Sequence, residues 1–191
     1  TILLGGNLGA SAEIILKKTG VDFICSGEGE RTAVDFANCW LTAEAKDDFV
    51  NVRGLTFLDE KRDMVVTPFQ DPLEAQNVFD VDWSLLSREA IDYFFPPHDV
   101  GALGISFFQD ARALQPHRRK KNLGYLLGSK GCVARCTFCH RWDKGIRYIP
   151  VPVVMERIDY FIEKYDAGFI LFGDENFGTD KRWLEEFIIE I

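Results

Sequence analysis

The chain has 191 residues, 47% of them hydrophobic and 27% charged, which predicts a folded globular protein made of one large domain or of parts of two. Its net charge of -8 argues against nucleic acid as a partner. The absence of 18 consecutive apolar residues and of a visible signal peptide predicts no membrane span and favours a cytoplasmic location.

The two ends of the sequence predict that the chain is a fragment. It lacks an initiator Met, begins inside the apolar run at residues 2–4, and stops within the periodic segment 183–191. We therefore expect elements of the same domains on both sides of it.

The first 48 residues alternate between strand and helix patterns. An apolar run ending at Gly5 and Gly6 precedes a helix pattern that begins near Ser11 and stops at Gly20. A second short run at 22–25 leads into the turn GEGE, which includes Gly27 and Glu28. The helix pattern after this turn has its apolar residues at positions 33, 36, 37, 40 and 41. Alternating strands and helices predict a parallel sheet.

Residues 49–121 form a different region. The segments GLTFL and MVVTP flank a polar loop at 59–63 and predict a β-hairpin. From residue 70 onwards, prolines and scattered aromatic residues without a sustained period predict a connector. Its basic run at 117–121 is interpreted as a solvated linker.

The strand and helix alternation returns at residues 122–191. GYLLGS at 124–129 predicts a strand, and the segment GCVARCTFC follows it. A helix is predicted from an apolar stripe at positions 154, 158, 161, 162 and 165, and then a strand and turn at 168–178. The cysteines are thus expected in a loop after the carboxyl end of a strand, where α/β proteins build their active sites.

Cys132, Cys136 and Cys139 have the spacing C-x3-C-x2-C. An odd total of five cysteines with three clustered does not fit a disulfide framework, so metal ligation is the better interpretation. Zinc would need a fourth ligand, for which the adjacent His140 is a candidate, whereas an ordinary four-iron cluster uses four cysteines. Three cysteines would leave one iron open, as a reactive centre requires.

The segment CVARCTFC resembles the cluster loop of the radical S-adenosylmethionine (SAM) enzymes, with Phe138 as the aromatic residue before the last cysteine. The resemblance implies that the three cysteines hold a [4Fe-4S] cluster whose fourth iron chelates SAM. One electron then cleaves SAM to a 5′-deoxyadenosyl radical. The turn Gly173, Asp174, Glu175 and Asn176 is similar to the family's SAM-binding turn, in which either acidic residue here can make the contact with the SAM amino group.

The N-terminal segments ILLGGN and VDFICSGEGE resemble the second half of the cobalamin-binding domain found in one subclass of this family. The resemblance implies that Gly5, Gly6, Gly27 and Glu28 line the cobalamin tail. Its further implications are an electron donor such as flavodoxin or ferredoxin, a small-molecule or peptide substrate, and methylation, cyclisation or rearrangement chemistry.

The fold class expected is α/β: the end of a Rossmann-like cobalamin-binding domain at 1–48, a hairpin and linker at 49–121, and the first βα units of a partial (β/α)6 radical SAM barrel at 122–191. Two alternatives remain open. One is a non-catalytic module with structural zinc or an electron-transfer cluster, and the other is a radical SAM enzyme whose N-terminal domain no longer binds cobalamin. Cys25 and Cys39 are interpreted as buried thiols, and Trp40 and Trp183 as core residues.

Overall fold

The computed structural model describes residues 1–6, 11–97, 121–139 and 145–191. The chain forms two units, one made of Thr1–Glu74 with Ala134–Lys144 and the other of Ala75–Val133 with Gly145–Ile191. Both units combine helices with strands, so the mixed α/β class is confirmed.

The elements of the first unit are β1 (Leu3–Leu4), α1 (Ala12–Lys18), β2 (Phe23–Cys25), α2 (Gly29–Trp40), a 3-10 helix (Lys46–Asn51), β3 (Leu55–Leu58) and β4 (Met64–Val66). The elements of the second unit are two 3-10 helices (Ala75–Asn77 and Trp83–Leu85), α3 (Arg88–Phe94), β5 (Asn122–Leu126), β6 (Ser129–Cys132), β7 (Gly145–Tyr148), α4 (Val151–Tyr165), β8 (Ala167–Phe172) and α5 (Lys181–Glu190).

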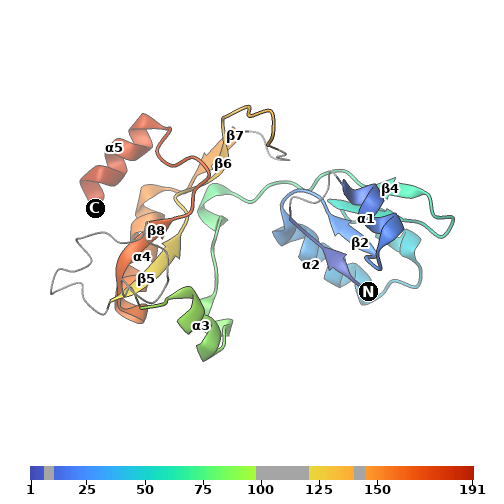
Figure 1. Ribbon diagram of the computed structural model, residues 1–191, viewed down its shortest axis with the longest axis horizontal. Coiled ribbons are helices and arrows are strands. Elements are labelled where there is room, and N and C mark those ends of the chain that lie inside the picture. The colour runs from blue at the N-terminus through green and yellow to red at the C-terminus, as the bar shows by residue number, and fades with distance from the viewer. Residues whose placement is uncertain (7–10, 98–120, 140–144) are drawn as a thin grey trace. The chain divides into compact units, whose positions relative to one another are not determined.

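The first unit has a four-stranded sheet in the order β1-β2-β3-β4. Figure 1 labels β2 and β4 of this sheet together with α1 and α2. β1 and β2 are parallel, as the strand and helix alternation predicts, and β3 and β4 form the predicted hairpin. β3 also pairs antiparallel with β2, with Phe57 opposite Phe23. The hairpin therefore extends the sheet, and the strand pairing does not break at residue 48.

The core of the first unit lies on both faces of this sheet, because successive strand residues point to opposite sides. Phe23 and Phe57 pack with Phe49 of the 3-10 helix and with Phe36 of α2. Ile24 packs on the other face with Leu16 of α1. One helix therefore covers each face.

The buried face of α2 differs from the predicted stripe. Thr32 is fully buried and Phe36 is half-buried, whereas Trp40 is 50% exposed, so its interpretation as a core residue is wrong. The Thr32 hydroxyl donates to the carbonyl of Arg53 at 3.0 Å. A threonine can face the core when its hydroxyl has such an acceptor, which an apolar pattern does not reveal.

The second unit is built on the parallel pair β5 and β8, with Leu126 opposite Phe172 at the carboxyl ends. α4 connects to β8 and packs against both strands. Its residues Val154, Ile158 and Phe161 are buried as predicted, while Ile162 is exposed. Trp183 of α5 is buried, as predicted, and its indole N–H donates to the carbonyl of Ile149 at 2.6 Å.

The β6–β7 hairpin is a feature that the sequence interpretation missed. β5 ends at Leu126, and β6 begins at Ser129 as a separate short strand. β6 pairs antiparallel with β7, which places Cys132 opposite Gly145. Cys132 thus lies in a strand rather than in the predicted loop. The segment SKGC has neither apolar alternation nor many β-branched residues, so its pairing depends on the partner strand.

Gly131 permits this hairpin. Its φ of +108° lies in a region that other residues rarely adopt, and a Cβ at this position would come within 2.4 Å of the Gly145 carbonyl oxygen. The close approach of the two strands beside Cys132 therefore requires glycine.

Candidate functional site

The carboxyl ends of β5 and β8 lie side by side, and the predicted SAM-binding turn follows β8 there. The backbone N–H of Gly173 donates to the carbonyl of Leu126 at 2.9 Å and continues the pairing past the last residue of β8. The chain then forms the turn at 173–176 after β8, while residues 127–128 connect β5 to Ser129, the first residue of β6. The structure thus brings the predicted turn next to the segment that leads into Cys132.

Asp174 joins the two connections. One carboxylate oxygen accepts from the backbone N–H of Gly128 at 2.9 Å, and the other accepts from the Ser129 hydroxyl. Both oxygens therefore have protein donors, and Asp174 fixes the start of β6 relative to the end of β8.

Asn176 makes the contact nearest to the cysteines. Its Nδ2 atom lies 3.5 Å from Sγ of Cys132, within the range of an N–H···S hydrogen bond. The predicted turn therefore contacts one of the three cysteines through its last residue.

Gly173 is required where it stands by the packing of Tyr125. A Cβ at Gly173 would lie 1.7 Å from the Tyr125 hydroxyl oxygen, and this hydroxyl donates to the Gly173 carbonyl at 3.4 Å. The glycine thus serves close packing of the turn against β5.

Two other residues predicted to bind SAM are exposed. Glu175 follows Asp174 with its side chain on the surface, and Phe138 is 84% exposed. The sequence left open which acidic residue of the turn contacts a ligand, and the structure gives Asp174 a bridging position.

None of the five cysteines, all of which lie in the described residues, forms a disulfide. Cys136 and Cys139 are exposed and joined locally by a hydrogen bond of 3.1 Å from the Cys139 N–H to the Cys136 carbonyl, while Cys132 is half-buried. Within the described residues, no three His, Cys, Asp or Glu side chains form a group that could hold a metal ion. His140, named above as a candidate zinc ligand, lies outside the described residues.

This donor set fits an iron–sulfur cluster by its chemistry. Thiolates are the ligands that such clusters use, and three reduced cysteines occur within eight residues. Two of them are accessible to incoming metal.

Gly128, Ser129 and Tyr125 were not identified from the sequence as part of this site. Their involvement depends on the pairing of β5 with β8, which places residues 45 to 48 positions apart in contact. Their position in the sequence could have identified them as site residues, because they lie immediately before the cysteine segment at the carboxyl end of a predicted strand.

The residues predicted to line a cobalamin tail gather at one edge of the first unit's sheet. Gly5 and Gly6 follow β1, and Gly27 and Glu28 follow its parallel neighbour β2. A Cβ on Gly5 or Gly6 would meet no atom within 4 Å, so the described surroundings leave space beside them. Parallel strands bring these segments together because their carboxyl ends share an edge.

The segment 69–73 lies over the same edge. A Cβ on Gly27 would be 3.4 Å from the Phe69 ring, and the Glu28 carboxylate accepts from the backbone N–H of Leu73 at 3.1 Å. Glu28, which is predicted to line the cobalamin tail, therefore also holds the 69–73 segment through a hydrogen bond.

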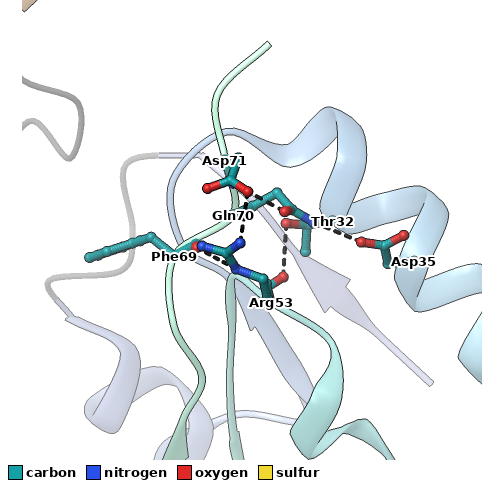
Figure 2. Close-up of polar contacts among 6 residues, drawn as sticks. All are labelled: Thr32, Asp35, Arg53, Phe69, Gln70 and Asp71. Atoms are coloured by element: carbon teal, nitrogen blue, oxygen red, sulfur yellow. Dashed lines mark hydrogen bonds and ion pairs between the residues drawn. The ribbon is translucent and has the colours of Figure 1, made fainter.

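Arg53 fixes this segment, as Figure 2 shows. Its guanidinium donates to the Phe69 carbonyl at 2.9 Å and to the Asp71 carboxylate at 2.7 Å, and Gln70 donates to Asp35 of α2 at 2.7 Å. The Phe69 side chain points away from this network and is 51% exposed (Figure 2). An aromatic ring is thus held at the surface beside the glycine edge.

The remaining two cysteines, Cys25 and Cys39, belong to the first unit. Cys25 is buried, and burial raises the pKa of its thiol. Cys39 packs against the core of the first unit, and its thiol donates to the Asp48 carbonyl at 3.6 Å. The interpretation of Cys25 as a buried thiol is confirmed, while Cys39 is only half-buried.

The fold is similar to that of part of the chain in solved cobalamin-dependent radical SAM enzymes. The solved structure of the cobalamin-dependent SAM radical enzyme OxsB, with aqua-cobalamin and SAM bound, matches 100% of this chain and 24% of its own at a TM-score of 0.59 and 20% identity. The radical SAM methyltransferase TsrM from Kitasatospora setae, with cobalamin and a [4Fe-4S] cluster bound, matches 98% of this chain and 33% of its own at a TM-score of 0.60 and 17% identity.

A curated relative extends the comparison to sequence. The anaerobic magnesium-protoporphyrin IX monomethyl ester cyclase of Rubrivivax gelatinosus is 22% identical over 181 residues, which is 94% of this chain and 28% of the cyclase. No family model matches the chain. The resemblance to cobalamin-binding radical SAM enzymes is thus confirmed over nearly the whole chain, and the chain spans between a quarter and a third of the length of these relatives.

None of the helices in the described part of the chain is long and apolar enough to cross a membrane.

Proposed function

We propose that this chain is part of a radical SAM enzyme that binds a [4Fe-4S] cluster, SAM and cobalamin. The observation that carries the proposal is the contact between the turn after β8 and the strand that bears Cys132, made by Asp174 to Ser129 and by Asn176 to Cys132. The segment implied to bind SAM and the segment implied to bind the cluster thus meet at the carboxyl edge of two parallel strands. Active sites of α/β proteins form at such edges.

Cys132, Cys136 and Cys139 are proposed to ligate the cluster. Such a cluster with one open iron would bind SAM and pass it the electron that cleaves it. Protein side chains cannot supply this redox chemistry by themselves. Asp174 is proposed to position β6, because both its oxygens are used by Gly128 and Ser129. Glu175, an exposed residue of the same turn, is proposed to contact the SAM amino group.

Cobalamin is proposed to bind at the edge formed by Gly5, Gly6 and Gly27. Among the described residues no atom would meet a Cβ on the first two glycines, and this space and the exposed ring of Phe69 support the assignment. The matched structures of OxsB and TsrM contain cobalamin, which is consistent with it.

The reaction is proposed to be a methylation, cyclisation or rearrangement of a small-molecule or peptide substrate. The relatives include a cyclase and a methyltransferase, so the chain's similarity does not select one of these reactions. A low-potential electron donor such as flavodoxin or ferredoxin would supply electrons.

The test is anaerobic reconstitution of the full-length protein with iron and sulfide, followed by electron paramagnetic resonance of the reduced protein with and without SAM. A signal that changes on addition of SAM supports an open iron that binds it. Replacing Cys136 by alanine should abolish the signal, while Cys39→Ala should retain it. Zinc in place of iron, or a signal indifferent to SAM, would contradict the proposal in favour of a non-catalytic metal module.

A further inference from the structure

We propose that Asn176 sets the reduction potential of the iron–sulfur cluster by donating a hydrogen bond to the Cys132 sulfur. This inference rests on the proposed function, since it requires Cys132 to be a cluster ligand. It gives Asn176 a role different from the SAM contact that the sequence resemblance implies.

The geometry supports a persistent hydrogen bond. The amide Nδ2 lies 3.5 Å from the sulfur, and both residues belong to the second unit. The turn that carries Asn176 is fixed by the Gly173 N–H to Leu126 bond and by the two bonds of Asp174. Cys132 is itself held in β6 opposite Gly145. Cys132 therefore lies on paired backbone, and Asn176 lies in a turn whose first two residues are held by hydrogen bonds to the β5–β6 segment.

The electrostatic consequence has a definite sign. Reduction of a cluster held by Cys132 by one electron from a low-potential donor would add one negative charge to the cluster and its thiolate ligands, and would form or break no bond to Cys132. An amide N–H directed at the sulfur stabilises this added charge, and hydrogen bonds to the sulfurs are among the factors that set cluster potentials. Asn176 thus raises the potential and makes the first electron transfer easier.

Asn176 is better suited than Asp174 of the same turn to donate a hydrogen bond to the cluster, because its side chain carries no charge. Asp174 would repel an electron-rich cluster if its carboxylate faced it, but its charge is directed to Gly128 and Ser129. The neutral amide two residues later supplies a donor without adding negative charge.

The experiment is a redox titration of the reconstituted full-length protein, followed by electron paramagnetic resonance, for wild type, Asn176→Leu and Asn176→Asp. Leucine removes the donor at similar size, and aspartate replaces it with a charged acceptor. We expect the midpoint potential to shift to more negative values in both variants, with the larger shift for Asn176→Asp. Iron and sulfide content per protein is measured in parallel.

Asn122→Leu is the matched control. The Asn122 amide also donates a hydrogen bond from β5, but to the carbonyl of Tyr165 at 2.8 Å, at the opposite end of the strand. Its removal is expected to lower stability without moving the potential, which separates a redox effect from a structural one.

The outcomes distinguish the two proposals. Unchanged potentials in both Asn176 variants with full iron content, or an equal shift in Asn122→Leu, would overturn the role of Asn176 and leave the proposed enzyme intact. A wild-type cluster indifferent to SAM would overturn the radical SAM function, while a potential shift in the Asn176 variants would still support the hydrogen bond. A protein that holds zinc overturns both.

Discussion

Asp174 is the residue whose environment departs most from what its sequence position suggests. An acidic residue in a turn after a strand is expected to be solvated or to contact a ligand, yet its two oxygens are used by Gly128 and Ser129. The adjacent Glu175 is exposed. Two acidic neighbours in one turn therefore have different environments, and the tertiary pairing of β5 with β8 distinguishes them.

Replacing Asp174 by alanine should destabilise the second unit. The change leaves the Gly128 N–H and the Ser129 hydroxyl without their acceptor, which costs about 1–3 kcal/mol of unfolding free energy. Urea unfolding of wild type, Asp174→Ala, Ser129→Ala and the double variant measures the loss, and the cycle isolates the coupling of the pair.

The control for this measurement is Glu185→Ala, an exposed position of α5 in the same unit. Its effect should stay within about 0.5 kcal/mol, as is usual for surface substitutions. Equal losses in Asp174→Ala and Glu185→Ala, or a coupling of zero between Asp174 and Ser129, would show that the bridge does not stabilise the fold.

At the scale of elements, the β6–β7 hairpin depends on Gly131. An alanine there would have to adopt a positive φ and would place Cβ against the Gly145 carbonyl oxygen. Strain of this kind costs of order 1–3 kcal/mol. We expect Gly131→Ala to lower the urea midpoint and to reduce the iron retained on reconstitution, because Cys132 follows directly in the strand.

Gly20→Ala provides the comparison for that variant. A Cβ at Gly20 meets nothing within 4 Å, and its φ is not in the positive region. Its urea midpoint and iron content should match wild type. A Gly131→Ala protein with the wild-type midpoint would mean that the hairpin tolerates a side chain.

The pairing of β1 with β2 should depend on pH through Asp22. Its carboxylate accepts from the Ile2 N–H at 2.9 Å and lies 3.4 Å from the Lys46 ammonium. The hydrogen bond from Ile2 is the main reason that the pKa of Asp22 lies below 3.8, its ordinary value. The folded state therefore favours the ionised carboxylate.

Acidification should therefore reduce the contribution of Asp22 to the free energy of unfolding. The stabilisation by Asp22 is fully present above its unfolded pKa and is lost as pH falls through the lower folded pKa. Urea unfolding at pH 6 and at successively lower values should show a smaller loss of stability in Asp22→Asn than in wild type. Identical pH slopes in the two proteins would contradict this account.

At the scale of the whole molecule, each unit has its own buried core. The first is centred on Phe23, Phe49 and Phe57, and the second contains Leu126 and Phe161. Stability in such an arrangement is distributed between units that can open separately.

Phe57→Ala should therefore destabilise one unit selectively. Removing a fully buried phenylalanine costs about 3–5 kcal/mol. Hydrogen exchange measured by mass spectrometry should become faster in β2 and β3 and stay unchanged in β5 and β8. Faster exchange in all four strands would show that the two units unfold together.

The sequence by itself determined the local features of this protein. Adjacent residues and short spacings predicted the parallel pair β1–β2, the β3–β4 hairpin, the buried stripe of α4 and the cysteine segment, because these depend on periodicity, turn residues and ligand chemistry within a few positions. The family resemblance also depends on such short motifs, and the comparisons confirm it.

Only the tertiary structure decided the contacts that join distant segments. The β6–β7 hairpin, the bridge from Asp174 to Ser129 and the bond from Asn176 to Cys132 link residues that no local pattern relates. The orientation of α2 was likewise decided by a buried threonine that found a backbone acceptor. Short polar strands and neutral amides carry little periodic signal, so their roles are fixed by which chain segment folds beside them.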